Sequence, residues 1–213
     1  MLRIFSLLIG LFCLPVQALE VLVSVHTQDN QPMPGAVIYL TSEQPLPPVA
    51  EGAVAEMDQI KKQFSPHILV VQKGTEVSFP NSDSIQHHVY SFSPAKTFQL
   101  QLYKDQSPEP LPFDQQGKVE LGCNVHDWML GYIYVVDTPY FGQTDEQGQL
   151  KLNVPAGDYS LYVRHPRIQE PSANLDQPLT LSADQKLKVQ LEQPLLPGLD
   201  DFEEDTDEFI GYE

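Results

Sequence analysis

Cysteine is scarce in this chain: only two occur among 213 residues. Two cysteines cannot build a disulfide scaffold for a chain of this length, and they exclude a zinc or iron–sulfur site made of four cysteines. The length is compatible with one large or two small globular domains. Stability must therefore come from hydrophobic cores, and each cysteine needs its own explanation.

Positive charge is also scarce. Twelve Lys and Arg residues oppose 29 Asp and Glu residues, which gives a net charge of −17. A field of this sign repels phosphate backbones and anionic headgroups. We therefore expect no nucleic-acid partner, and we expect any protein partner to present a basic docking surface.

The acids are concentrated at the C-terminus. The segment Gly198–Glu213 contains eight acidic residues and no basic one. Such a composition buries too little apolar area to order itself, which predicts a disordered acidic tail over 198–213. The tail has two candidate roles: solubility, or docking to a basic partner.

A hydrophobic run long enough to span a membrane is missing at the N-terminus. The apolar run Ile4–Leu14 is about half of the ~20 residues that a span needs. It follows Arg3 and precedes Val16-Gln17-Ala18, which has acceptable residues for signal cleavage. We predict a cleavable signal peptide over 1–18, export to the periplasm and no membrane span in the mature chain.

Cleavage after Ala18 would leave Cys123 as the single cysteine. In an oxidising compartment a lone exposed thiol is open to oxidation or to pairing with another chain. Cys123 is therefore expected to be protected by burial or used as a ligand.

Helical periodicity is missing as well. The chain instead alternates apolar and polar residues at period two, with Gly, Pro, Asn and Asp between the runs, which predicts an all-β sandwich architecture. One exception is Ala53–Lys62, whose modest amphipathicity favours a helical turn. The expected strands are Val21–Val25, Ala36–Leu40, Ile68–Val71, Glu76–Phe79, His87–Phe92, Phe98–Tyr103, Lys118–Leu121, Gly131–Val136, Leu150–Val154, Tyr159–Val163 and Lys186–Leu191.

One short segment combines three soft ligand types. Cys123, His126 and Met129 follow the pattern C-x₂-H-x₂-M. A thiolate, an imidazole and a thioether suit copper better than magnesium or calcium. Each residue alone is more often a core side chain, but the three together at this spacing indicate a metal site.

A second imidazole has to come from elsewhere in the chain. His87 and His88 begin the expected strand His87–Phe92, and neighbouring strand residues point to opposite faces, so only one of them can enter the site.

Around this motif, Phe64–Val136 resembles the type 1 blue-copper cupredoxins of the plastocyanin, pseudoazurin and amicyanin kind. The short gap between His126 and Met129 is similar to the amicyanin loop. The other matching features are Pro66, Lys73-Gly74-Thr75, Asn81-Ser82-Asp83, His87-His88-Val89, Phe113-Asp114 and Gly117.

The resemblance implies a Greek-key β-sandwich that holds one type 1 copper ion. It implies His87, Cys123 and His126 as equatorial ligands and Met129 as the axial ligand; His87 takes the ligand position because the family has an Asn after it. It also places His88 and Asn124 beside the ligands, with His88 expected to orient the Cys123 loop by a hydrogen bond.

A saturated four-ligand site implies an electron carrier, not an enzyme. Two alternatives remain: a copper-handling protein without electron-transfer duty, and a β-sandwich binding module with a vestigial site.

The segments on both sides of this domain share a second resemblance. Val21–Leu40 and the later Thr144–Tyr159 are similar to carboxypeptidase regulatory-like β-sandwich domains. This implies that 19–45 and 139–197 form a second small sandwich that brackets a copper domain at 55–138. Such a domain would position the copper site against a partner.

Overall fold

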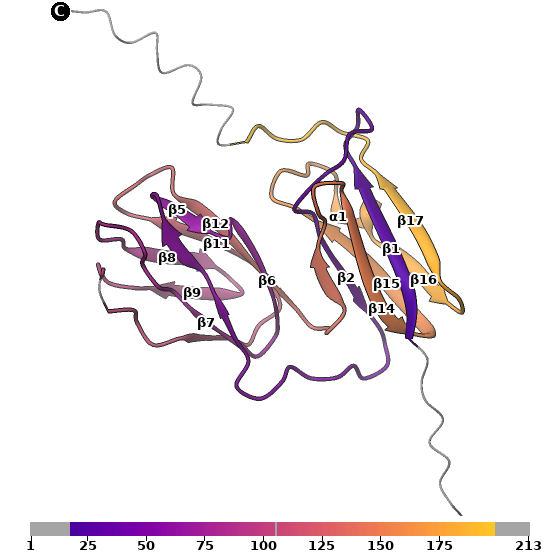
Figure 1. Cartoon of the computed structure of the whole chain (residues 1–213), viewed down its shortest axis with the longest axis horizontal. Helices are drawn as coiled ribbons and strands as arrows, with labels where there is room; N and C mark the ends of the chain where they lie inside the picture. Colours follow the sequence, from indigo (N-terminus) through magenta and orange to yellow (C-terminus); the bar gives the residue numbers. More distant parts are fainter. Residues whose placement is uncertain (1–17, 105, 199–213) are drawn as a thin grey trace, which may run out of the picture.

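The computed structural model describes residues 18–104 and 106–198. The predicted signal peptide and acidic tail lie, apart from Ala18 and Gly198, outside the described residues. The described part contains seventeen strands and one short helix, α1 (Ser172–Leu175), which confirms the all-β prediction (Figure 1). Within that part, no helix is long and apolar enough to cross a membrane.

One sandwich is built from the segments on both sides of the central domain. One sheet has the order β14-β1-β17, formed by β14 (Gln149–Pro155), β1 (Ala18–His26) and β17 (Gln185–Gln190). The other has the order β13-β2-β15-β16, formed by β13 (Phe141–Gln143), β2 (Val37–Thr41), β15 (Gly157–Arg164) and β16 (Gln177–Leu181).

The core of this sandwich follows from strand alternation. Val21, Val23 and Val25 of β1 are fully buried, while the residues between them are partly exposed. β1 runs antiparallel to β14 and parallel to β17, so both of its neighbours in the sheet lie more than 100 residues away in the sequence. The flanking segments therefore form the second sandwich that was predicted; its relation to carboxypeptidase regulatory-like domains stays a prediction.

The central domain lies between these flanks in the sequence and contains the remaining strands. Its five-stranded sheet has the order β6-β12-β11-β8-β9, and a three-stranded sheet has the order β10-β7-β3. These strands are β6 (Ile68–Gln72), β12 (Leu130–Val136), β11 (Gly117–Cys123), β8 (Val89–Ser93), β9 (Lys96–Gln99), β10 (Leu111–Phe113), β7 (Thr75–Ser78) and β3 (Val54–Glu56). A hairpin of β4 (Asp58–Ile60) and β5 (Gln63–Ser65) completes the domain.

The helical turn predicted for Ala53–Lys62 is wrong. This segment forms β3, which pairs in parallel with β7, and then the β4–β5 hairpin. Its weak amphipathicity is overridden by pairing with strands that are distant in sequence, which local periodicity does not report. Lys61 and Lys62 both have positive φ, at 54° and 60°, as the two-residue turn of a tight hairpin requires.

The two sandwiches lie beside each other (Figure 1) and share an apolar cluster of side chains. Tyr39 of β2 is buried in one cluster with Ile68 of β6 and Tyr134 of β12. The ring of Tyr39 also stacks on Tyr162 of β15, with centroids 4.7 Å apart. The outer face of β6 and β12 is therefore covered by the second sandwich.

Candidate metal centre

The thiol of Cys123 is carried into the core by the alternation of β11. Val119, Leu121 and Cys123 are all buried, while the residues between them lie toward the outer face. Cys123 is a free cysteine and belongs to the central hydrophobic core. The thiol is therefore protected by burial, as expected from the sequence.

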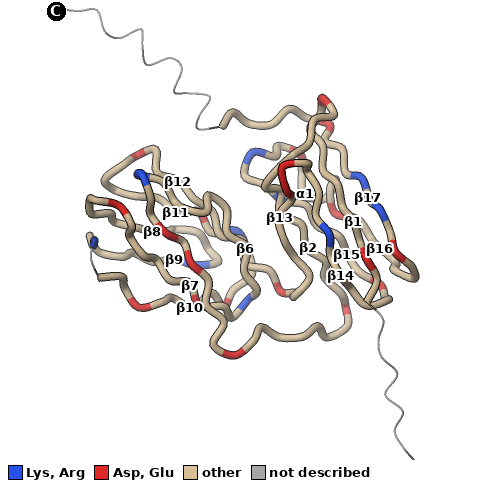
Figure 2. The backbone as a smooth tube through the Cα atoms, viewed as in Figure 1, with Lys and Arg blue, Asp and Glu red and all other residues tan. Residues whose placement is uncertain are grey.

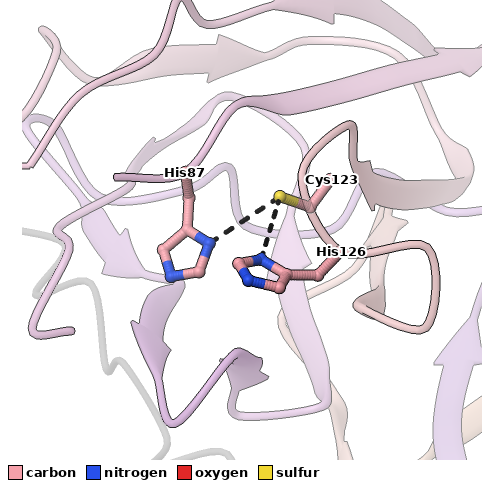
Figure 3. A group of neighbouring side chains, drawn as sticks. All are labelled: His87, Cys123 and His126. Atoms are coloured by element: carbon pink, nitrogen blue, oxygen red, sulfur yellow. Dashed lines mark hydrogen bonds between the residues drawn. The ribbon is translucent and has the colours of Figure 1, made fainter. Parts of the chain in front are cut away.

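Two imidazoles face this thiol. His87 lies just before β8, where its N–H and C=O both bond to Tyr103, and its ring is fully buried. Its Nδ1 lies 3.7 Å from the Cys123 Sγ (Figure 3). His126 comes from the loop after β11, and its Nδ1 lies 3.9 Å from the same sulfur. One ligand atom from each of the three residues lies within 4.8 Å of the others.

These separations fit one metal ion bound by all three residues. With metal–nitrogen bonds of about 2.0–2.1 Å and a metal–sulfur bond of about 2.3 Å in a trigonal plane, the nitrogen–sulfur separation is about 3.8 Å. Burial lowers the pKa of His126, and the neighbouring His87 and Lys62 lower it further. The neutral imidazole that a metal requires is thereby favoured. Two imidazoles, a thiolate and a nearby Met form the donor set of a copper site.

Met129 occupies the same core. It is 1% exposed, clusters with Cys123, and its N–H donates to the carbonyl of His126 at 3.0 Å. The Cys123–Met129 loop is thus closed by its own backbone directly before β12 begins at Leu130. Coordination by the Met129 thioether stays a prediction.

His87 and His88 are separated as strand alternation predicts. His87 faces Cys123, whereas the His88 Nε2 lies 2.7 Å from the Gln99 Nε2. The structure differs from the expectation that the His88 side chain orients the Cys123 loop. The backbone makes that contact, because the Asn124 N–H donates to the His88 carbonyl at 3.3 Å. Asn124 itself is exposed.

Sequence reasoning missed Asp83. Its Oδ2 lies 2.8 Å from the His87 Nε2, on the side of the ring away from Cys123. Partial burial raises the pKa of Asp83, but hydrogen bonds from the Lys62 backbone, from His87 and from the Lys61 backbone outweigh it, so the pKa is lowered. The only sequence signal was the four-residue spacing between Asp83 and His87, which is weak in an irregular segment.

The outer edge of the centre is apolar and exposed. Trp128 is 58% exposed, and its ring meets His126 edge-on with centroids 5.3 Å apart. Val125, in the same loop, is 48% exposed. His126 is therefore the donor residue that lies beside the exposed rim, whereas His87 is enclosed.

No protein-family model matches the chain, and no curated protein matches it. Similar solved structures include a copper-containing nitrite reductase from Thermus scotoductus SA-01, at 22% identity and a TM-score of 0.37, over 42% of this chain and 25% of that one. This chain thus spans about a quarter of the reductase. Two reduced amicyanin variants are 24% and 26% identical, with TM-scores of 0.36 and 0.35; each alignment covers 46% of this chain and 98% or 99% of the amicyanin.

Proposed function

We propose that this protein is a periplasmic type 1 copper protein that carries single electrons between redox partners. The observation that carries the proposal is the buried Cys123 thiol facing the Nδ1 atoms of His87 and His126. Two imidazoles and a thiolate in a plane, with a weak axial Met, are the donor set of blue-copper electron-transfer sites.

A copper ion at this centre would supply one-electron chemistry by cycling between Cu(I) and Cu(II). The chain's own contribution is rigidity. Cys123 is at the end of a paired strand. The backbone N–H and C=O of His87 both form hydrogen bonds with the backbone of Tyr103, and His126 lies in a short closed loop. Donors held in this way change position little when the charge at the centre changes, which favours fast electron exchange.

We further propose that the protein is a carrier and not an enzyme. If Met129 is the fourth donor, no coordination position is left for a substrate, and metal catalysis needs an open one. Asp83, the carboxylate in contact with His87, already accepts hydrogen bonds from the Lys61 and Lys62 backbone. The Asp83 carboxylate therefore has a structural role, as an acceptor of these hydrogen bonds.

The proposed partner is a redox protein with a basic docking surface. The support is charge: 29 acidic residues oppose 12 basic ones, and acidic residues occur along the backbone of both sandwiches (Figure 2). Complementary charge speeds the encounter of two proteins and selects the partner. The periplasmic location rests on the signal peptide predicted over 1–18.

The test is a spectrum of the copper-loaded mature chain. We expect an intense thiolate-to-copper absorption toward the red end of the visible range, together with reversible one-electron redox cycling. Cys123→Ser should abolish the absorption, while His88→Gln, which changes the imidazole that faces Gln99, should keep it.

Absence of the band in the copper-loaded wild-type protein would overturn the proposal. Copper binding with the band but without reversible cycling would favour the copper-handling alternative.

A further inference from the structure

The hairpin turn between β4 and β5 is conformationally costly. Lys61 and Lys62 have φ values of 54° and 60°, in the left-handed region. Turns of this shape favour Asn and Gly, and other residues enter it only where the surroundings compensate. The turn therefore needs a hydrogen-bonding partner that stabilises this backbone geometry and offsets its conformational cost.

That partner is the carboxylate of Asp83. The Lys61 N–H donates to Oδ1 at 2.9 Å, and the Lys62 N–H donates to Oδ2 at 2.7 Å. Both carboxylate oxygens are held, so the side chain has one orientation. The Asp83 N–H in turn donates to the Asn81 Oδ1 at 2.9 Å, which ties down the backbone of the same segment.

The clamped carboxylate points at His87. The Asp83 Oδ2 lies 2.8 Å from the His87 Nε2, and an ionised carboxylate can only accept a hydrogen bond. The proton of the neutral ring must therefore be on Nε2. This leaves the lone pair on Nδ1, which faces the Cys123 Sγ at 3.7 Å.

We propose that Asp83, clamped by the Lys61–Lys62 turn, is a positioning residue for the metal centre. It holds the His87 ring in one plane and in the tautomer that presents Nδ1 to the metal. Its negative charge also makes His87 a stronger donor, which favours the oxidised ion. The effect on the metal rests on the proposed function, whereas the effect on the ring belongs to the metal-free protein as well.

Asp58 provides a matched control. It lies on the β4–β5 hairpin that Asp83 clamps, and its Oδ1 and Oδ2 accept hydrogen bonds from the Ser82 N–H at 3.1 Å and the Ser82 hydroxyl at 2.7 Å. It therefore anchors the same segment one residue before Asp83, and the hydrogen bonds it accepts come from Gln59 and Ser82. Loss of Asp58 should loosen the segment without removing the acceptor for His87.

The first measurement uses the metal-free full chain. Long-range ¹H–¹⁵N spectra at alkaline pH, where free imidazoles are neutral, report which ring nitrogen holds the proton. We expect only the Nε2–H form of His87 in the wild type and in Asp58→Asn. Both Asp83→Ala and Asp83→Asn should show a mixture, because an amide can donate as well as accept.

The second measurement is copper affinity and reduction potential. Asp83→Ala should bind copper about 10–100-fold more weakly and have a higher potential; Asp83→Asn should shift in the same direction, and Asp58→Asn should match the wild type. If Asp83→Ala fails to fold, the copper affinity and reduction potential of Asp83→Asn test the proposal instead.

An unchanged His87 tautomer in a folded Asp83 variant would overturn the proposal, as would an unchanged potential and affinity. If the wild type binds no copper, the proposed function fails, and the tautomer result still decides whether Asp83 positions the ring.

Discussion

The ring of Tyr90 lies across the backbone of Gly122, the residue that precedes Cys123. The two residues are paired between β8 and β11, and a Cβ at Gly122 would lie 2.7 Å from the Cζ and Oη atoms of Tyr90. This distance is below van der Waals contact. Tyr90 thus packs closely over the strand end that carries the thiol only because position 122 has no side chain.

We predict that Gly122→Ala destabilises the protein by about 1–3 kcal/mol, because the added methyl group forces the Tyr90 ring to move. Urea denaturation measures the change in the free energy of unfolding. Gly157→Ala serves as the control, since its Cβ would meet the Tyr159 ring at an ordinary 3.4 Å. In Gly122→Ala combined with Tyr90→Ala the cost should be less than additive; strict additivity would contradict the packing argument.

We expect Met129→Leu to keep the thiolate-to-copper absorption and to raise the reduction potential, because loss of the axial thioether disfavours the oxidised ion. The fold should lose less than about 1.5 kcal/mol, since Leu and Met have similar volumes. Met57→Leu is the matched control, because Met57 is fully buried in the same core. Equal potentials in wild type and Met129→Leu would argue against axial coordination by Met129.

The stability of the fold should depend on pH through His165. Burial, followed by Arg167 and His67, lowers the pKa of His165 from 6.5 to about 4. As pH falls from 6.5 to about 4, the unfolded chain takes up a proton on His165 that the folded chain does not. His165 therefore contributes full stability above pH 6.5 and loses it progressively down to about pH 4.

The expected loss is on the order of 1 to 3 kcal/mol, at about 1.4 kcal/mol per pH unit. The free energies of unfolding measured at about pH 7 and about pH 4.5 should differ less in His165→Gln than in the wild type. Comparing the two proteins cancels the contribution of the other acids and bases, because both chains contain them. An identical pH dependence in both proteins would show that the pKa of His165 is the same in the folded and the unfolded chain, which would contradict the prediction.

Much of the fold could be predicted from the alternation of apolar and polar residues alone. Each of the eleven predicted strands overlaps a strand of the structure, and several of them, such as β1, β11 and β15, bury alternate residues. Six strands were not predicted: β3, β4, β5, β10, β13 and β16. All of them except β16 have only three residues, and their pairing partners, rather than their own side chains, define them.

The part of the candidate site whose residues lie close together in the sequence could be predicted. Cys123 and His126 are three residues apart in one loop, so their proximity follows from the sequence. The contact of His87 with Cys123 spans 36 residues and depends on the pairing of β8 with β11. The contact of Asp83 with the Lys61–Lys62 turn crosses between two irregular segments, for which the sequence has no periodic signal.

The sequence by itself determined an all-β chain and one loop with a thiol, an imidazole and a thioether, because alternation and short spacing are local properties. The resemblance implied His87 rather than His88 as the ligand, and the structure brings His87 to the thiol. That Asp83 holds the far side of that ring, and that Tyr39 and Tyr134 join the two sandwiches, could be seen only in the tertiary structure. These relationships depend on which segments distant in sequence meet and in which register, and a shift of one residue in β2 or β12 would turn Tyr39 or Tyr134 to the opposite face.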